Sequence, residues 1–120
     1  MAFDEKLAGR VRRALATERA EEKRMFGGLC FLVRGHMALG IVGDELMVRV
    51  GRESYEAALA EPHAREMDFT GRPLRGMVYV GQAGLATPAA LRRWVSRGAA
   101  HARSLPPKAS PAKPRRRVRR

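Results

Sequence analysis

The chain has 120 residues, a formal net charge of +12 and 45% hydrophobic residues. This length holds one small domain and little else, and the hydrophobic fraction is sufficient for a packed core, which excludes a chain that is disordered throughout. No apolar run approaches the ~20 residues needed to cross a bilayer, and the first residues are acidic where a signal peptide is basic. We therefore expect a soluble, cytoplasmic protein that makes no membrane contact.

The single cysteine, Cys30, excludes an intrachain disulfide. It lies inside an apolar run, where a reduced thiol behaves as a small hydrophobic side chain. We expect it to be a buried packing residue, which fits a reducing compartment.

The positive charge is distributed unevenly along the chain. Residues 104–120 carry seven basic side chains and no acid, whereas residues 1–103 carry seventeen basic and twelve acidic ones. The seven are Lys108, Lys113, Arg115, Arg116, Arg117, Arg119 and Arg120. The same segment is rich in proline, which removes backbone donors, and it has no apolar repeat. It is predicted to be a disordered, extended basic tail that follows a folded domain of residues 1–103.

The first predicted elements are a helix and a turn. Apolar side chains recur every three or four positions in residues 3–16, which predicts an amphipathic helix. The polar segment 17–24 is expected to extend or cap that helix. Gly27 and Gly28 are expected to end the preceding element, because glycine adopts backbone angles that other residues resist.

Three consecutive strands are predicted next, over residues 29–34, 37–42 and 45–50. Each pair is joined by two residues that include a glycine, which is typical of tight hairpins between antiparallel strands. The first of the three is apolar on both faces and is expected to be the central strand. The other two alternate in character, which favours one face on the core and one nearer solvent.

The second half of the chain predicts a short helix over 53–60, strands over 67–69 and 77–80, and a long helix from Thr87 to about Arg103. Threonine can cap a helix, and the proline that follows it is tolerated in the first turn. The fold class is therefore α+β: a small antiparallel sheet, formed by a meander of hairpins and one or two further strands, packed by amino- and carboxy-terminal helices.

The motif at residues 24–28, Arg-Met-Phe-Gly-Gly, precedes the hairpins, and segments 44–51, 67–73 and 76–80 continue the same order. Together they resemble the amino-terminal domain of the TfoX/Sxy family over about residues 5–103. The resemblance implies an antiparallel sheet packed by helices. It also implies a regulator, since the family's named members regulate natural competence in transcription with the cyclic-AMP receptor protein. Those members generally carry a second, helical domain, where this chain has the basic tail.

The basic residues predict contact with a polyanion. Seven cations without an acid would neutralise phosphates and release counterions, with a salt slope on the order of −6 if all seven contact duplex DNA. In the last predicted helix, Arg92, Arg93 and Arg97 lie opposite the apolar stripe and would extend that surface. A solvated polar face of an ordinary amphipathic helix explains them equally well.

No catalytic, cofactor or metal site is predicted. The histidines, His36, His63 and His101, are far apart and lack the spacing of a zinc site. Gly27 and Gly28 precede a strand instead of opening a helix, so they indicate a structural turn and not a phosphate loop. The leading hypothesis is a non-enzymatic, regulator-like domain that contacts DNA or RNA through its tail, alongside a protein partner or a second copy. The alternatives are a protein-interaction module with an incidental tail and, third, a small-molecule binder or enzyme.

Overall fold

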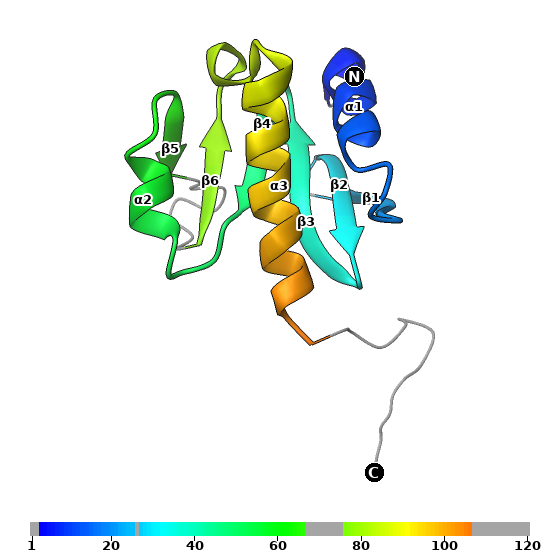
Figure 1. The fold of residues 1–120 in the computed structure, drawn as a ribbon. Helices are drawn as coiled ribbons and strands as arrows, with labels where there is room; N and C mark the ends of the chain where they lie inside the picture. The colour runs from blue at the N-terminus through cyan, green and yellow to red at the C-terminus, as the bar shows by residue number, and fades with distance from the viewer. Residues whose placement is uncertain (1–2, 26, 67–75, 107–120) are drawn as a thin grey trace.

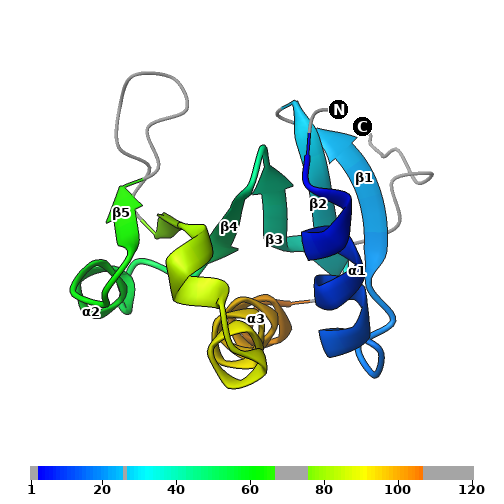
Figure 2. The same ribbon diagram turned by 90° about the horizontal axis from the view of Figure 1, so that it is seen from above.

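The computed structural model describes residues 3–25, 27–66 and 76–106 and shows a twisted antiparallel sheet with three α-helices on one of its faces (Figures 1 and 2). In chain order the elements are α1 (Glu5–Ala14), β1 (Glu21–Met25), β2 (Gly28–Val33), β3 (His36–Val42), β4 (Glu45–Arg49), α2 (Tyr55–Leu59), β5 (Ala64–Glu66), β6 (Met77–Val80), the 3-10 helix η1 (Gln82–Leu85) and α3 (Pro88–Ser104). The strand order is β1-β2-β3-β4-β6-β5. The predicted α+β class is confirmed.

Both long helices begin at the capping residues that the sequence supplies. The side chain of Asp4 accepts hydrogen bonds from the backbone N–H groups of Lys6 and Leu7, at 2.9 and 3.3 Å. The hydroxyl of Thr87 accepts one from the N–H of Ala90, at 3.1 Å. These bonds satisfy donors that have no partner within the helix, and they explain why each helix starts where it does.

The three predicted hairpin strands correspond to β2, β3 and β4. Arg34 and Gly35 connect β2 to β3 with φ angles of 55° and 84°, the geometry of a turn whose twist matches that of the flanking strands. Gly28 begins β2 directly against β3: a Cβ atom placed on it would lie 1.9 Å from the carbonyl oxygen of Ile41. Gly27 lies in the turn before β2 with a φ of 73°, so the predicted structural turn is confirmed for Gly27, whereas Gly28 is the first residue of the strand.

The main core lies between the helices and one face of the sheet. Trp94 of α3 and Phe31 of β2 are each 1% exposed, and Leu39 of β3 is fully buried. Helix α3 approaches β3 closely through Gly98, where an added Cβ would lie 2.5 Å from the carbonyl oxygen of Ala38. The small residue at this point sets the distance between the helix and the sheet.

A smaller cluster occupies the other face of the sheet. It is formed by Cys30, Met47 and Tyr79, from β2, β4 and β6. Cys30 is fully buried there, as predicted, and burial raises the pKa of its thiol to about 11.

Cys30 is therefore expected to resist thiol reagents in the folded protein. At pH 8 a thiol with a pKa of about 11 is ionised on the order of one part in a thousand, and the thiolate is the reactive form. We expect slow reaction with 5,5′-dithiobis(2-nitrobenzoate) in buffer and rapid release of one equivalent in concentrated urea. Rapid stoichiometric reaction in buffer would contradict the buried position.

Two predictions that concern the sheet were wrong, and one strand prediction falls outside the described residues. Residues 21–25 form the edge strand β1, paired with β2, whereas the sequence predicted that segment 17–24 would extend or cap the first helix. The strand predicted to be central, β2, lies next to that edge, and β3 and β4 occupy the middle of the sheet. The strand predicted over 67–69 is not described, and the structure shows β5 just before it.

Candidate functional site

The boundary predicted for the basic tail, at residue 104, is slightly early: Ser104 is the last residue of α3, and the structure describes the chain to residue 106. The seven cations of the tail lie outside the described residues. The chain reaches Pro106, whose carbonyl oxygen lies 2.6 Å from Nε2 of His36, at the start of β3. This contact places Pro106 beside the start of β3, just after the C-terminal end of α3.

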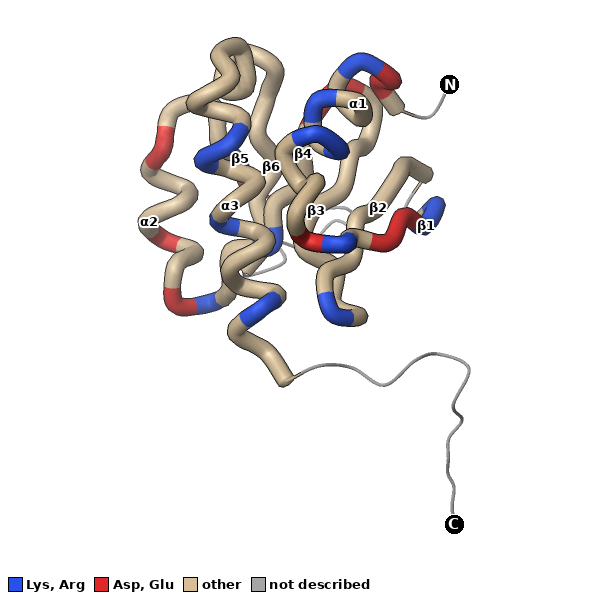
Figure 3. The backbone as a smooth tube through the Cα atoms, turned by 45° about the vertical axis from the view of Figure 1, so that its right-hand side comes forward, with Lys and Arg blue, Asp and Glu red and all other residues tan. Residues whose placement is uncertain are grey.

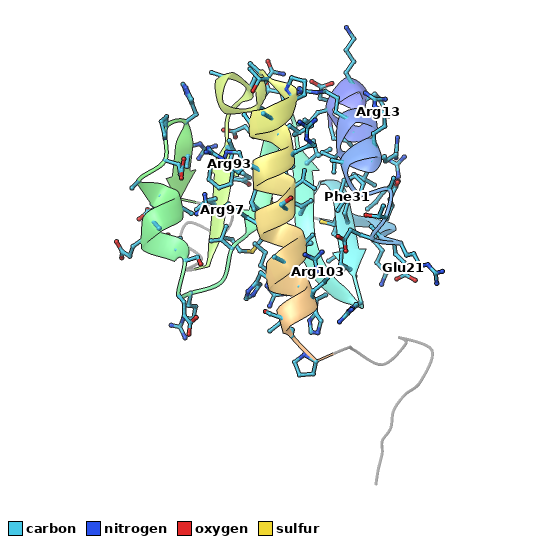
Figure 4. All side chains as sticks on the ribbon, in the orientation of Figure 1. Arg13, Glu21, Phe31, Arg93, Arg97 and Arg103 are labelled. Carbon is cyan, nitrogen blue, oxygen red and sulfur yellow. The ribbon has the colours of Figure 1, made fainter. Side chains whose placement is uncertain are left out.

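The three arginines predicted on the last helix do not form one surface. Arg93 and Arg97 both form ion pairs with Glu61, which follows α2, at 3.2 and 3.4 Å. The guanidinium of Arg97 also lies 4.7 Å from the ring centroid of Trp94. Figure 4 shows both side chains on the side of α3 that faces α2. Arg92 makes no ion pair with any residue that the structure describes. Of the three arginines, it is therefore the one whose charge is not paired with a described carboxylate.

Arg92 instead lines a shallow groove of about 270 Å³ between α1 and the first turns of α3. Arg10 and Arg13 of α1 line the same groove, and no acidic residue of the described chain does. Arg10 is held there because its Nη2 donates a hydrogen bond to the carbonyl oxygen of Leu85, at 2.7 Å. The packing of α1 beside α3 thus creates a cationic groove. The sequence did not predict it, since helical periodicity places Arg13 only on an outer face.

The charges of the domain are interspersed over most of its surface. Acidic positions lie on and beside α2 and also at the start of α1 and on β1, and basic positions lie on α1, on β1 and along α3 (Figure 3). The three arginines of the groove are therefore a local cationic cluster and not part of a wholly basic face.

A larger cleft of about 970 Å³ lies at the opposite end of α3. Its walls come from β3, β4, the loop between β4 and α2, the start of β6 and the last turns of α3. Four of its side chains are basic: Arg49, Arg52, Arg97 and His101. The only acidic side chain among the described lining residues is Glu53. The cleft is therefore cationic.

His101 lines the same cleft as these charges. An added Cβ on Gly51 would lie 2.6 Å from its Nδ1, so the ring packs directly against the loop after β4. Burial lowers the pKa of His101, and the positive charge of Arg49 and the neighbouring His36 lower it further. The neutral form of the ring is consequently favoured, and an anion bound beside it would favour the protonated form.

The described residues offer cations and hydrogen-bond donors at both sites. No three His, Cys, Asp or Glu side chains in the described part of the chain could hold a metal ion together. None of the described helices has the length and apolar character needed to span a membrane. The chemistry that both sites support is the binding of phosphate or carboxylate groups by arginine.

Comparison with known proteins gives one match. The model of the family described as the TfoX N-terminal domain matches residues 13–102, from the end of α1 to near the end of α3. No curated protein matches the chain. No solved structure matches it either.

Proposed function

Because the chain belongs to the TfoX N-terminal domain family, we propose that it is a non-enzymatic, cytoplasmic regulator of transcription or competence, with the basic tail as its nucleic-acid contact. The observation that carries the proposal is the segregation of charge: seven cations and no acid in residues 104–120. Such a segment binds the phosphate backbone through counterion release, without reading the bases.

The groove between α1 and α3 offers a second place for phosphate contacts on the nucleic-acid strand that the tail is proposed to bind. Arg92 beside the groove and Ser104 at the end of α3 are separated by about 18 Å along the helix axis, at about 1.5 Å per residue. One strand of B-DNA places about five phosphates over that length. A backbone that follows α3 would therefore meet the tail at one end and Arg10, Arg13 and Arg92 at the other.

The test uses the full chain and a variant in which five tail arginines become glutamine. The five are Arg115, Arg116, Arg117, Arg119 and Arg120. Binding to a fluorescent DNA duplex is measured by anisotropy across a salt series. We expect the variant to bind more weakly and its salt slope to be smaller by about 4 to 5, at about 0.9 for each lost phosphate contact.

Single arginine variants in the same assay test the groove. Arg92→Gln is expected to reduce the salt slope by about 1, because its charge is free to pair with a phosphate. Arg93→Gln is the matched control on the adjacent residue, and we expect a smaller change because Glu61 already pairs with Arg93. Equal losses from the two variants would argue against the groove as the contact.

Identical affinity and salt slope for the wild-type chain and the five-arginine variant would contradict the tail's role. That result would favour the protein-interaction module, in which the tail is incidental.

A further inference from the structure

We propose that the cleft at the C-terminal end of α3 binds a small organic phosphate of mononucleotide size, with its phosphate on the arginines and its apolar portion on Met37 and Met77. This goes beyond the proposed nucleic-acid contact, because the ligand is a free small molecule and the residues that bind it are not in the tail.

The charge of the cleft supports an anionic ligand. Arg49, Arg52 and Arg97 carry three fixed positive charges, against the single carboxylate of Glu53. Guanidinium groups present a planar set of N–H donors that matches the oxygens of phosphate, which makes arginine the usual residue for its recognition.

The arginines retain donors for a ligand. Only one hydrogen bond ties Arg49 to the described residues, a long one of 3.5 Å from its Nη1 to the carbonyl oxygen of Met37. Arg97 is held in place by Glu61 and by the ring of Trp94, yet a guanidinium has five N–H donors and this ion pair uses one of its nitrogens. Arg52 is exposed and makes no ion pair with a described residue.

The size and composition of the cleft favour an organic phosphate over the inorganic ion. Its volume of about 970 Å³ lies at the upper end of the range for small-molecule sites, roughly 300–1,000 Å³. Met37 and Met77 line the cleft and are half-buried. Part of each side chain packs against the cluster of Cys30, Met47 and Tyr79, and the remaining part offers apolar surface, since methionine adapts to flat or irregular apolar groups. A ligand that carries both a phosphate and an apolar ring would use both parts of the surface.

His101 provides a spectroscopic reporter inside the site. The charged and titratable groups that line the same cleft are Arg49 from β4, Arg52 and Glu53 from the following loop, and Arg97 from its own helix, with His36 of β3 close by. A bound phosphate dianion would offset these positive charges and raise the pKa of the imidazole. The ring resonances of His101 should therefore titrate at higher pH when the ligand is present.

The test titrates uridine 5′-monophosphate into the full-length protein and follows binding by calorimetry and by the NMR signals of His101. Uridine and inorganic phosphate are titrated in parallel. We expect the mononucleotide to bind at least about tenfold more tightly than uridine, because hydrogen bonds to charged groups carry much of the affinity. We expect the same margin over inorganic phosphate, because that ion makes no contact with the apolar part of the cleft. Equal binding of uridine and its monophosphate would overturn the proposal, and so would the absence of binding at millimolar ligand.

A matched pair of variants locates the ligand. Ala100→Glu places a carboxylate in the cleft at an exposed helical position, and glutamate is a good helix former, so the fold is preserved. We expect it to weaken mononucleotide binding by about tenfold or more. The control is Ala89→Glu, also exposed on α3 but about 16 Å away along the axis, which is expected to change affinity less than about twofold.

The two variants change the net charge equally, so equal weakening would show only general attraction to a basic protein and would overturn the proposal. Displacement of the mononucleotide from the cleft by a single-stranded oligonucleotide that lacks a terminal phosphate would also overturn the proposal. The cleft would then bind the phosphodiester backbone as part of the nucleic-acid surface. Every variant here keeps the tail, so this result is independent of the five-arginine experiment.

Discussion

Replacing Gly28 with alanine is expected to lower the free energy of unfolding by about 3 kcal/mol or more. The added Cβ would lie 1.9 Å from the carbonyl oxygen of Ile41 and 3.0 Å from its carbonyl carbon. These are backbone atoms of β3 beside the paired residues Leu29 and Ile41. No side-chain rotation can relieve the overlap, so the strands themselves must separate.

Gly27→Ala is the matched control in the same turn. Apart from its chain neighbours, no described residue has an atom within 4 Å of a Cβ at Gly27, although its φ of +73° disfavours other residues. We expect a cost of about 1 kcal/mol from that backbone angle alone. Urea unfolding followed by circular dichroism measures both variants. A loss from Gly27→Ala as large as that from Gly28→Ala would show that backbone angle, and not the close approach of β3, determines the requirement for glycine.

Gly98→Ala and Gly9→Ala are expected to change stability in opposite directions, although both replace a helical glycine with the best helix former. Gly98→Ala should destabilise the protein by about 2 kcal/mol, because the new Cβ would lie 2.5 Å from the carbonyl oxygen of Ala38 and 2.8 Å from Cδ2 of Leu39. The leucine can move, but the strand backbone cannot move without disturbing the sheet. The overlap therefore outweighs the gain in helix propensity.

Gly9→Ala should stabilise the protein by about 0.5 to 1 kcal/mol, since alanine reduces the conformational freedom of the unfolded chain. The only described atom near its added Cβ is Nη1 of Arg13, at an ordinary 3.8 Å. Thermal unfolding of the two variants beside the wild type tests the pair. Stabilisation by Gly98→Ala would contradict the close packing of α3 on β3.

The parts of the fold that the sequence predicted are those with strong local signals. The two-residue glycine turns of the hairpins and the Thr87-Pro88 start of α3 depend on residues adjacent in the chain. Strand β1 has no such signal: its five residues are all exposed and four are charged. Charged side chains are common on edge strands because they discourage pairing with another chain, so the pattern resembled a helix extension. Strand β2 is apolar on both faces because it contacts both clusters, and β1 covers its outer edge.

The candidate sites depend on contacts between distant segments, which composition and periodicity do not contain. The charge of the tail was evident from the sequence alone. The neutralising partner of Arg93 and Arg97 was not, because Glu61 lies 32 and 36 residues away from them. Likewise the cleft combines β3, β4, β6 and α3, and only the completed sheet brings its arginines together.

The contact between His36 and Pro106 has a consequence for the kinetics of association. It anchors Pro106 on the domain, and fourteen further residues follow. A chain of that length spans at most about 50 Å when fully extended, well beyond the roughly 18 Å of helix between the anchor and the groove. If the tail binds a nucleic-acid strand as proposed, the strand would be held near the groove at an effective concentration that short tethers raise to the millimolar range. Weak groove contacts would then mainly slow its dissociation.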